Sequence, residues 1–354
     1  MDLTQLKTES PLVFGFAESR IGGRAENQDS FAWADTPIGF LITVCDGMGG
    51  GPGGKTASFI AVNEIIAGVM EADQQEETAN ILIKAIRRAN MAIITRGNEQ
   101  PELKGMGSTC TVVLINSKFA TIAHVGDSRV YQFRGRTKIF RTFDHSMVFD
   151  LVKQKVITEE QARLSAQSNV ITRALGIKPD LEVEILERPF EAGDRFLLCT
   201  DGIHGSIEEK RLIKQVTNRK IALGPVVDGI ATEIDNIGRI SGGGHDNLTL
   251  AIIETKLNSI KKDSMSKKIK QILLAIGAVC IISIAVNIFL TITTIGQSNT
   301  LKDLGDQEIL MHTNDSLIGE IKKTELKRTE DSAKIEAIIQ ELEKDPKFKD
   351  SMNT

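Results

Sequence analysis

Short apolar runs that border an aspartate recur along residues 1–256 of this 354-residue chain. The runs that predict strands are residues 12–16, 40–45, 109–115, 120–125, 195–199 and 248–253. Two helical patterns, residues 55–70 and 77–94, lie between the early runs. The second pattern predicts a buried stripe made of Ile81, Ile83, Ala85, Ile86 and Ala89. Strands that are neighbours along the chain, with helices in separate blocks, favour antiparallel sheets with helices outside them, so we predict an α+β fold.

Four aspartates border these runs beside a small or turn-forming residue, and Asp29 makes a fifth. The four are Asp46, Asp127, Asp201 and Asp246. Each alone is more typical of a turn, but carboxylates at strand ends can converge at one rim of a sheet. An oxygen-only cluster suits a hard ion such as Mg²⁺ or Mn²⁺. The neighbouring Gly47 lets the backbone approach such an ion, and together these residues predict a metal site.

Residues 49–56 match G-x-x-x-x-G-K-T, the phosphate-binding loop of nucleotide triphosphatases. An ATPase is therefore one alternative. In such proteins the strand leads directly into the first glycine of the loop, whereas here residues 46–48 intervene. The loop also needs a parallel sheet with further β-α units, which residues 109–134 do not supply. We interpret the match as accidental.

A series of short motifs follows in order along residues 14–253. They are Arg24-x-x-Asn27-x-Asp29, Asp46-Gly47-Met48-Gly49-Gly50, Gly105-Met106-Gly107-Ser108-Thr109, Val125-Gly126-Asp127-Ser128-Arg129, Asp144-His145-Ser146, Ile171-Thr172-Arg173-Ala174-Leu175-Gly176, Thr200-Asp201-Gly202 and Asp246-Asn247-Leu248-Thr249. The series resembles the PP2C-type metal-dependent protein phosphatases of the PPM family. Many motifs in one order are more specific than a single pattern. The resemblance implies an α-β-β-α sandwich of two antiparallel sheets flanked by helices.

The resemblance also implies an activity: hydrolysis of phosphoserine and phosphothreonine in proteins by a water activated between two Mg²⁺ or Mn²⁺ ions. The chain would then be a phosphoric monoester hydrolase acting on phosphorylated protein in signal transduction. Arg24 would bind the phosphate and act in catalysis with Asp46. The implied metal ligands are Asp29, Asp46, the Gly47 carbonyl, Asp127, Asp201 and Asp246. Asp127 would help to hold a third, weaker ion.

Several positions depart from the family's pattern. Some members carry a histidine, a candidate general acid, where this chain has Met48, so that a water or another group would protonate the leaving group. Lys155 replaces a usual glycine and Ser165-Ala166 a usual His-Pro, in and after a segment that resembles the family's mobile flap. A catalytically weak pseudophosphatase, acting as a membrane-linked phosphoprotein-binding or regulatory module, is the alternative. The five aspartates argue against it.

Residues 271–296 carry no charged side chain and are long enough to span a bilayer as one helix. The basic residues that precede them are Lys261, Lys262, Lys267, Lys268 and Lys270. The positive-inside rule places the part before this segment in the cytoplasm and the tail outside. We predict a single-pass protein of the cell membrane in four parts. They are a phosphatase domain (1–256), a basic juxtamembrane linker (257–270), a transmembrane helix (271–296) and a polar, helical extracytoplasmic tail (297–354).

Net charge and composition limit the classes of partner that the chain is expected to bind. A formal net charge of -4, with one Trp and one Tyr, argues against nucleic-acid binding. The four cysteines form no C-x-x-C pair and lie in apolar runs, as expected of reduced, buried thiols. The tail allows a protein partner or a signal input, although anchoring alone is the simpler explanation.

Overall fold

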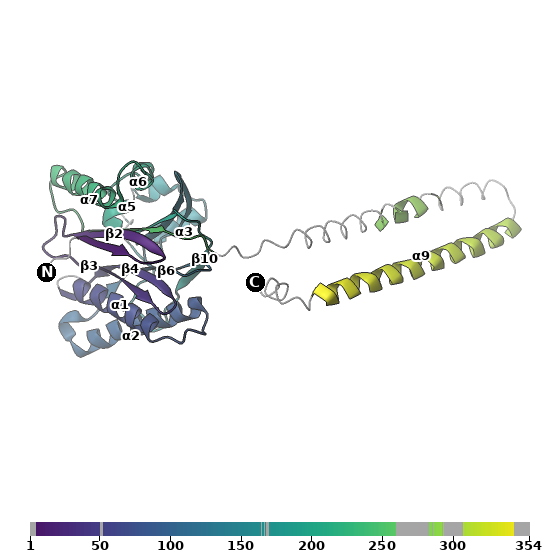
Figure 1. Cartoon of the computed structure of the whole chain (residues 1–354), viewed down its shortest axis with the longest axis horizontal. Coiled ribbons are helices and arrows are strands. Elements are labelled where there is room, and N and C mark those ends of the chain that lie inside the picture. The colour runs from purple at the N-terminus through teal and green to yellow at the C-terminus, as the bar shows by residue number, and fades with distance from the viewer. Residues whose placement is uncertain are drawn as a thin grey trace. The chain divides into compact units, whose positions relative to one another are not determined.

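The computed structural model describes residues 5–49, 52–163, 165, 167, 170–259, 283–284, 286–291, 293 and 307–342. The chain divides into two compact units, Met1–Ser264 and Met265–Thr354. The first unit contains the strands, and Figure 1 shows them as a central double layer with helices on either side.

Two antiparallel sheets form the centre of the first unit. The first sheet has the order β1 (Gln5–Glu9), β2 (Val13–Arg20), β12 (Leu248–Thr255), β11 (Arg195–Cys199), β8 (Arg129–Arg134) and β9 (Thr137–Arg141). The second has the order β10 (Glu184–Arg188), β7 (Ala120–Val125), β6 (Cys110–Ile115), β4 (Gly39–Met48) and β3 (Asp29–Thr36), with β5 (Gly107–Ser108) paired to β4. The predicted α+β fold with two antiparallel sheets is confirmed.

Helices cover the outer face of each sheet. On the second sheet lie α1 (Pro52–Met70) and α2 (Thr78–Glu99), followed by the 3-10 turn η1 (Pro101–Leu103). On the first lie α5 (Asp201–His204), α6 (Glu209–Val216) and α7 (Leu223–Ile240). Figure 1 shows these two groups on opposite sides of the strands. The short helices α3 (Met147–Lys153) and α4 (Glu159–Arg163) follow β9.

Three apolar clusters correspond to these layers. The cluster between the sheets includes Phe40, Ile42, Val113, Phe196 and Ile253. The other two lie between each sheet and its helices. Strands β6 and β7 are buried at every position, because both faces of their sheet are covered. This explains why their sequences are continuous apolar runs rather than alternating ones.

Two local details differ from the sequence prediction. Helix α1 begins at Pro52, earlier than the predicted start at residue 55. In α2 the buried stripe contains Leu82, whereas Ile83 is only half-buried, because Leu82 lies on the same helical face as the other buried residues. The segment at Gly126 and Asp127 joins β7 of one sheet to β8 of the other, so the chain crosses between the sheets there.

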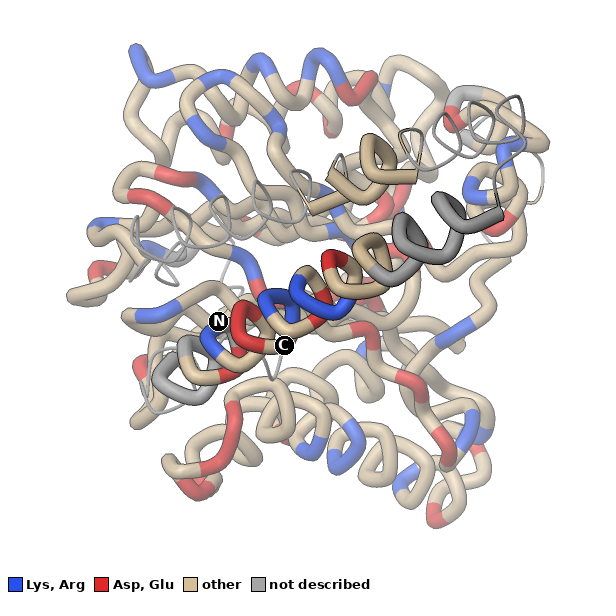
Figure 2. The backbone as a smooth tube through the Cα atoms, turned by 90° about the vertical axis from the view of Figure 1, so that its right-hand side faces the viewer, with Lys and Arg blue, Asp and Glu red and all other residues tan. Residues whose placement is uncertain are grey.

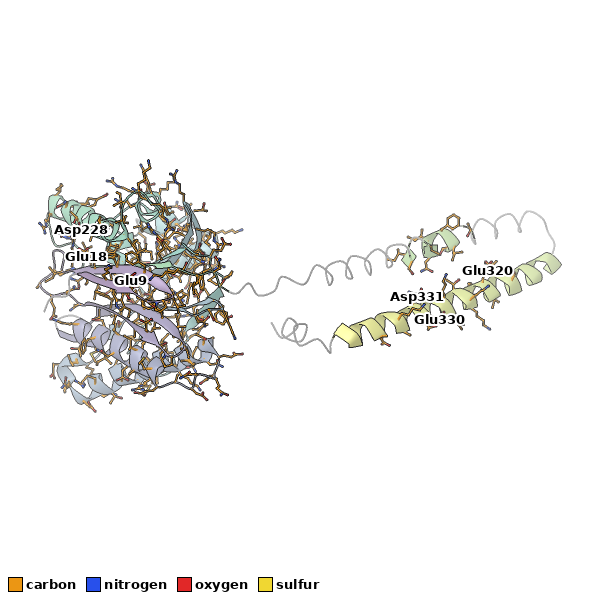
Figure 3. All side chains as sticks on the ribbon, viewed as in Figure 1. Glu9, Glu18, Asp228, Glu320, Glu330 and Asp331 are labelled. Carbon is orange, nitrogen blue, oxygen red and sulfur yellow. The ribbon has the colours of Figure 1, made fainter. Side chains whose placement is uncertain are left out.

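The second unit contains the long helix α9 (Gln307–Leu342). Basic and acidic residues are interspersed along it (Figure 2). Glu320, Glu330 and Asp331 project from its surface (Figure 3). Most of the predicted transmembrane segment, residues 271–296, lies outside the described residues. Among the helices that are described, none is long and apolar enough to cross a membrane.

Candidate active site

The ends of several strands meet at one cleft of about 510 Å³. Asp46 lies near the end of β4, Asp127 follows β7, Asp201 follows β11, and Asp246 precedes β12. All four line the cleft, together with Arg24, Gly47 and Met48. Residues far apart in the sequence are therefore brought together as the sequence analysis expected.

Asp29 is buried and does not line the cleft. It stands opposite Asp46 in the antiparallel β3–β4 pair, and its side chain is 8% exposed. The Thr200 hydroxyl donates a hydrogen bond of 3.0 Å to Asp29 Oδ2. Burial, with the negative charge of Asp201 as a smaller cause, raises the pKa of Asp29 to about 7. Two facing carboxylates in neighbouring strands repel each other unless a proton or a cation lies between them.

The charged forms of the aspartates that line the cleft are also destabilised. Burial, then the charges of Asp29 and Asp201, raises the pKa of Asp46 well above its usual range. Burial, then the charge of Asp246, raises the pKa of Asp201 to about 6. Burial, then Asp201, also raises the pKa of Asp127 well above its usual range. Each carboxylate therefore gains from a nearby positive charge.

One buried oxygen marks where such a charge fits. Asp201 Oδ1 is buried, and no hydrogen bond reaches it from the described part of the chain. An orphaned carboxylate oxygen is costly unless an ion or a water satisfies it. An oxygen-only donor set of several carboxylates suits Mg²⁺ or Mn²⁺. The residues present therefore fit a divalent cation at this cleft.

The backbone around Asp46 is fixed by the segment that begins at Gly107. Asp46 N–H donates to Thr109 Oγ1 at 2.8 Å, and Thr109 N–H donates to Asp46 O at 2.8 Å. The Ser108 hydroxyl donates to the same carbonyl at 3.0 Å. At Gly47 an added Cβ would lie 2.0 Å from the Gly54 carbonyl oxygen. Only glycine fits there, so the start of α1 packs directly against the backbone that follows Asp46.

Arg24 lies at the mouth of the cleft. Its Nη2 is 3.0 Å from Asp246 Oδ2, and the two side chains are 53% and 41% exposed. A guanidinium has five N–H donors, more than this contact uses, and their fork matches the oxygens of a phosphate group. Arg24 therefore places a phosphate-binding group beside the cleft carboxylates.

The alternative of a nucleotide-binding loop is wrong. Strand β4, which leads into residues 49–56, pairs antiparallel with both of its neighbours, β3 and β6, whereas a nucleotide-binding core places this strand in a parallel sheet. Lys55, the lysine of the matched pattern, instead forms an exposed ion pair of 3.5 Å with Glu26.

A second cleft of about 670 Å³ shares Asp127, Asp201 and Asp246 with the first and continues along α3, α4 and α6. His204 lines it and was assigned no role from the sequence. Its Nε2–H donates to the Asp127 carbonyl at 3.0 Å, and burial lowers the pKa of His204 to about 3, so the ring is neutral. The partner lies 77 positions away along the chain, so no local sequence signal marks this contact.

A family model described as "Protein phosphatase 2C" matches residues 18–225. The serine/threonine phosphatase stp of Listeria welshimeri is 32% identical over 246 residues, which cover 69% of this chain and 92% of that protein. The chain therefore belongs to the protein phosphatase 2C family.

Solved structures agree with this assignment. The serine/threonine phosphatase Stp1 from Staphylococcus aureus matches with a TM-score of 0.63 and 26% identity, over 70% of this chain and 96% of that one. The catalytic domain of the protein phosphatase PstP, solved with 2 manganese ions, matches with a TM-score of 0.57 and 29% identity, over 69% and 99% of the two chains.

In the absence of metal, we expect the Asp201→Asn variant to become more stable relative to the wild type as the pH rises. The folded pKa of Asp201, about 6, lies above the ordinary value of 3.8. The folded state therefore binds this proton more tightly than the unfolded state. The contribution of Asp201 to the free energy of unfolding falls as the pH rises from about 4 to about 6. His124 and His204, whose pKa values are lowered to about 3, act in the opposite sense, but equally in both proteins.

Denaturant unfolding in EDTA, at several pH values, measures this difference. The free energy of unfolding of Asp201→Asn minus that of the wild type should rise with pH. Asp228→Asn is the control, because Asp228 is exposed and pairs with Arg20 outside the cleft. A difference for Asp201→Asn that stays constant from pH 4 to pH 7 contradicts the repulsion described above.

Proposed function

We propose that this chain is a metal-dependent protein phosphatase that hydrolyses phosphoserine and phosphothreonine in proteins. The observation that carries the proposal is the meeting of Asp46, Asp127, Asp201 and Asp246 with Arg24 around one cleft, in a chain of the protein phosphatase 2C family. Relatives named serine/threonine phosphatases support the substrate class. The PstP structure with manganese ions supports the metal.

The proposed ligands are those that the family resemblance implies, and all of them except Asp29 line the cleft. Asp46, the Gly47 carbonyl, Asp201 and Asp246 would hold two Mg²⁺ or Mn²⁺ ions. Asp29 would act through water, and Asp127 would help to hold a third ion. Bound divalent cations supply a lowered water pKa and neutralise phosphoryl charge.

The chain's own groups orient the substrate. Arg24 would bind two phosphoryl oxygens with its guanidinium fork, and its ion pair with Asp246 holds it at the cleft mouth. Met48 lines the cleft and cannot donate a proton. His204 Nε2–H is committed to the Asp127 carbonyl. A water or another group would therefore protonate the leaving oxygen.

The activity test is hydrolysis of a phosphothreonine peptide by the full chain with Mn²⁺ and with EDTA. We expect turnover only with Mn²⁺, and Asp201→Asn should reduce it to the metal-free level. Arg24→Ala should lower kcat/KM by roughly 10- to 150-fold, because it removes a charge-assisted hydrogen bond worth about 1.5–3 kcal/mol.

Arg88→Ala is the matched control. Arg88 pairs with Glu64 and Glu71 on α1 and its neighbouring turn, and it does not line either cleft. Its kcat/KM should stay within twofold of the wild type, a change of about 0.4 kcal/mol. A folded wild-type protein that binds Mn²⁺ but hydrolyses no phosphopeptide would favour the pseudophosphatase instead.

We further propose that residues 271–296 tether the phosphatase domain, residues 1–256, to a membrane through the basic linker, residues 257–270. The support is the uncharged run and the lysines that precede it. The linker and the phosphatase domain would then lie on the cytoplasmic side, with residues 297–354 on the other.

Membrane fractionation tests this tether. The full chain should stay with the membrane pellet after an alkaline carbonate wash and be released by detergent, because only insertion survives that wash. A chain ending at residue 259 should be found in the supernatant. Release of the full chain by carbonate would contradict insertion of residues 271–296.

A further inference from the structure

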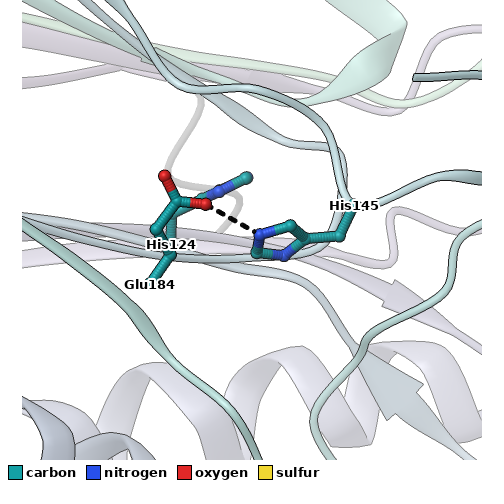
Figure 4. Close-up of side chains that lie close together, drawn as sticks. All are labelled: His124, His145 and Glu184. Carbon is teal, nitrogen blue, oxygen red and sulfur yellow. Dashed lines mark hydrogen bonds and ion pairs between the residues drawn. The ribbon is translucent and has the colours of Figure 1, made fainter. Parts of the chain in front are cut away.

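Three side chains lie close together: His124 of β7, His145 before α3, and Glu184 of β10 (Figure 4). His124 and Glu184 stand opposite each other in the β7–β10 pair. His145 Nε2 is 3.0 Å from Glu184 Oε2, and the two imidazole rings pack with centroids 4.5 Å apart. His124 and His145 are buried, whereas Glu184 is partly exposed.

The hydrogen bonds of His145 determine its tautomer. Gly126 N–H donates to His145 Nδ1 at 3.2 Å, so Nδ1 carries the lone pair. In the neutral ring Nε2 therefore carries the proton and donates it to Glu184. The potential ligand atoms of the three residues lie within 4.8 Å of one another. However, a metal at Nε2 would need the proton on Nδ1, where it would face the Gly126 N–H.

His145 contacts the peptide groups on both sides of the Gly126 Cα. Its ring accepts from Gly126 N–H, and its own backbone N–H donates to Gly126 O at 2.8 Å. Gly126 has a φ of 102°, and an added Cβ would lie 2.7 Å from Thr109 Cγ2. This position therefore requires glycine, which alone adopts such a backbone freely and would otherwise be mobile.

Asp127, the next residue, is 8% exposed and lines both clefts. Its carbonyl accepts from His204 at 3.0 Å. The turn is thus anchored on one side by His145 and on the other by His204. These contacts restrict the backbone rotations at Gly126, and those rotations determine where the Asp127 Cα lies and so which positions its carboxylate can reach.

We propose that Glu184 and His145 are positioning residues for Asp127. Glu184 fixes the ring of His145, and His145 holds the peptide groups before and after Gly126. The turn that carries the Asp127 carboxylate is thereby held at the edge of the metal cleft. The inference rests on the proposed function, in which Asp127 helps to hold the weakest of the bound cations. It makes the edge strand β10 a determinant of cation affinity although its side chains do not line the cleft.

Two substitutions separate the two hydrogen bonds of His145. In His145→Asn the amide oxygen lies where Nδ1 was and can still accept from Gly126, but the group that donates to Glu184 is lost. In His145→Gln the longer side chain can still donate to Glu184, but nothing remains at the Nδ1 position. His145 is buried, and both replacements are smaller than histidine, Asn more so than Gln, so thermal unfolding checks that both variants fold.

Mn²⁺ binding to the full chain, followed by calorimetry and electron paramagnetic resonance, is the measurement. We expect His145→Gln to weaken the weakest Mn²⁺ binding step by roughly 2- to 13-fold, the value of one neutral hydrogen bond of about 0.5–1.5 kcal/mol. His145→Asn should weaken this step less, because the hydrogen bond from Gly126 N–H remains. Glu184→Gln should also weaken it less, because the Gln amide oxygen can still accept from His145. Turnover at saturating Mn²⁺ should be close to that of the wild type in all three.

The matched control is Glu182→Gln. Glu182 is 76% exposed and pairs with Arg173, and it lies shortly before β10, so the same substitution there should leave Mn²⁺ binding unchanged. A double variant supplies the specific test: in an Asp127→Asn background, His145→Gln should add no further loss of Mn²⁺ affinity.

Two results would overturn the positioning role while leaving the phosphatase proposal intact. One is equal Mn²⁺ affinity in His145→Asn and His145→Gln. The other is a full loss from His145→Gln in the Asp127→Asn background. Absence of any Mn²⁺-dependent turnover in the wild type would instead contradict the proposed function.

Nitrogen NMR of His145 should show the proton on Nε2, and a zinc-induced shift of that nitrogen would reveal a metal site in place of the hydrogen-bond pair.

Discussion

Buried carboxylates that repel one another dominate the electrostatics of the cleft, and the fold must hold them in place. Asp29 and Asp46 face each other across two paired strands. Burial raises the pKa of both, and the charge of Asp201 raises it further. Such an arrangement is unfavourable in the metal-free chain. It persists because the strands that carry the aspartates also contribute to the apolar layers on both faces of each sheet. Those apolar layers stabilise the fold, and a cation in the cleft would relieve the repulsion among the carboxylates.

Thr109 connects the parts of the site that come from different sheets. It exchanges hydrogen bonds with the backbone of Asp46, and its hydroxyl lies 2.7 Å from the hydroxyl of Ser128. It also packs against Gly126 closely enough to exclude a side chain there. One residue thus fixes the end of β4 and the turn that crosses from the second sheet to the first. The positions of Asp46 and Asp127 are coupled through it.

The sequence predicted the features that depend on local chemistry. Strands β7 and β11 were predicted at their observed bounds, because both are continuous apolar runs. Four strand-end aspartates were predicted to converge, and they do. Strand β3 was not predicted, because its alternation is weak and most of its residues are only half-buried. The contacts of His204 with Asp127 and of His145 with Glu184 span 77 and 39 positions. These contacts form only when the sheets pack, so no local sequence pattern predicts them.

The most direct measurement is anomalous diffraction near the manganese absorption edge, from crystals of residues 1–264 soaked in Mn²⁺. The proposed site predicts anomalous peaks between Asp46, Asp201 and Asp246, with a weaker peak near Asp127. Asp201 Oδ1, the buried oxygen that lacks a hydrogen-bond partner in the described chain, should contact one of the ions. Peaks confined to His124, His145 and Glu184, or none in the cleft at saturating Mn²⁺, would contradict both the metal site and the activity assigned to it.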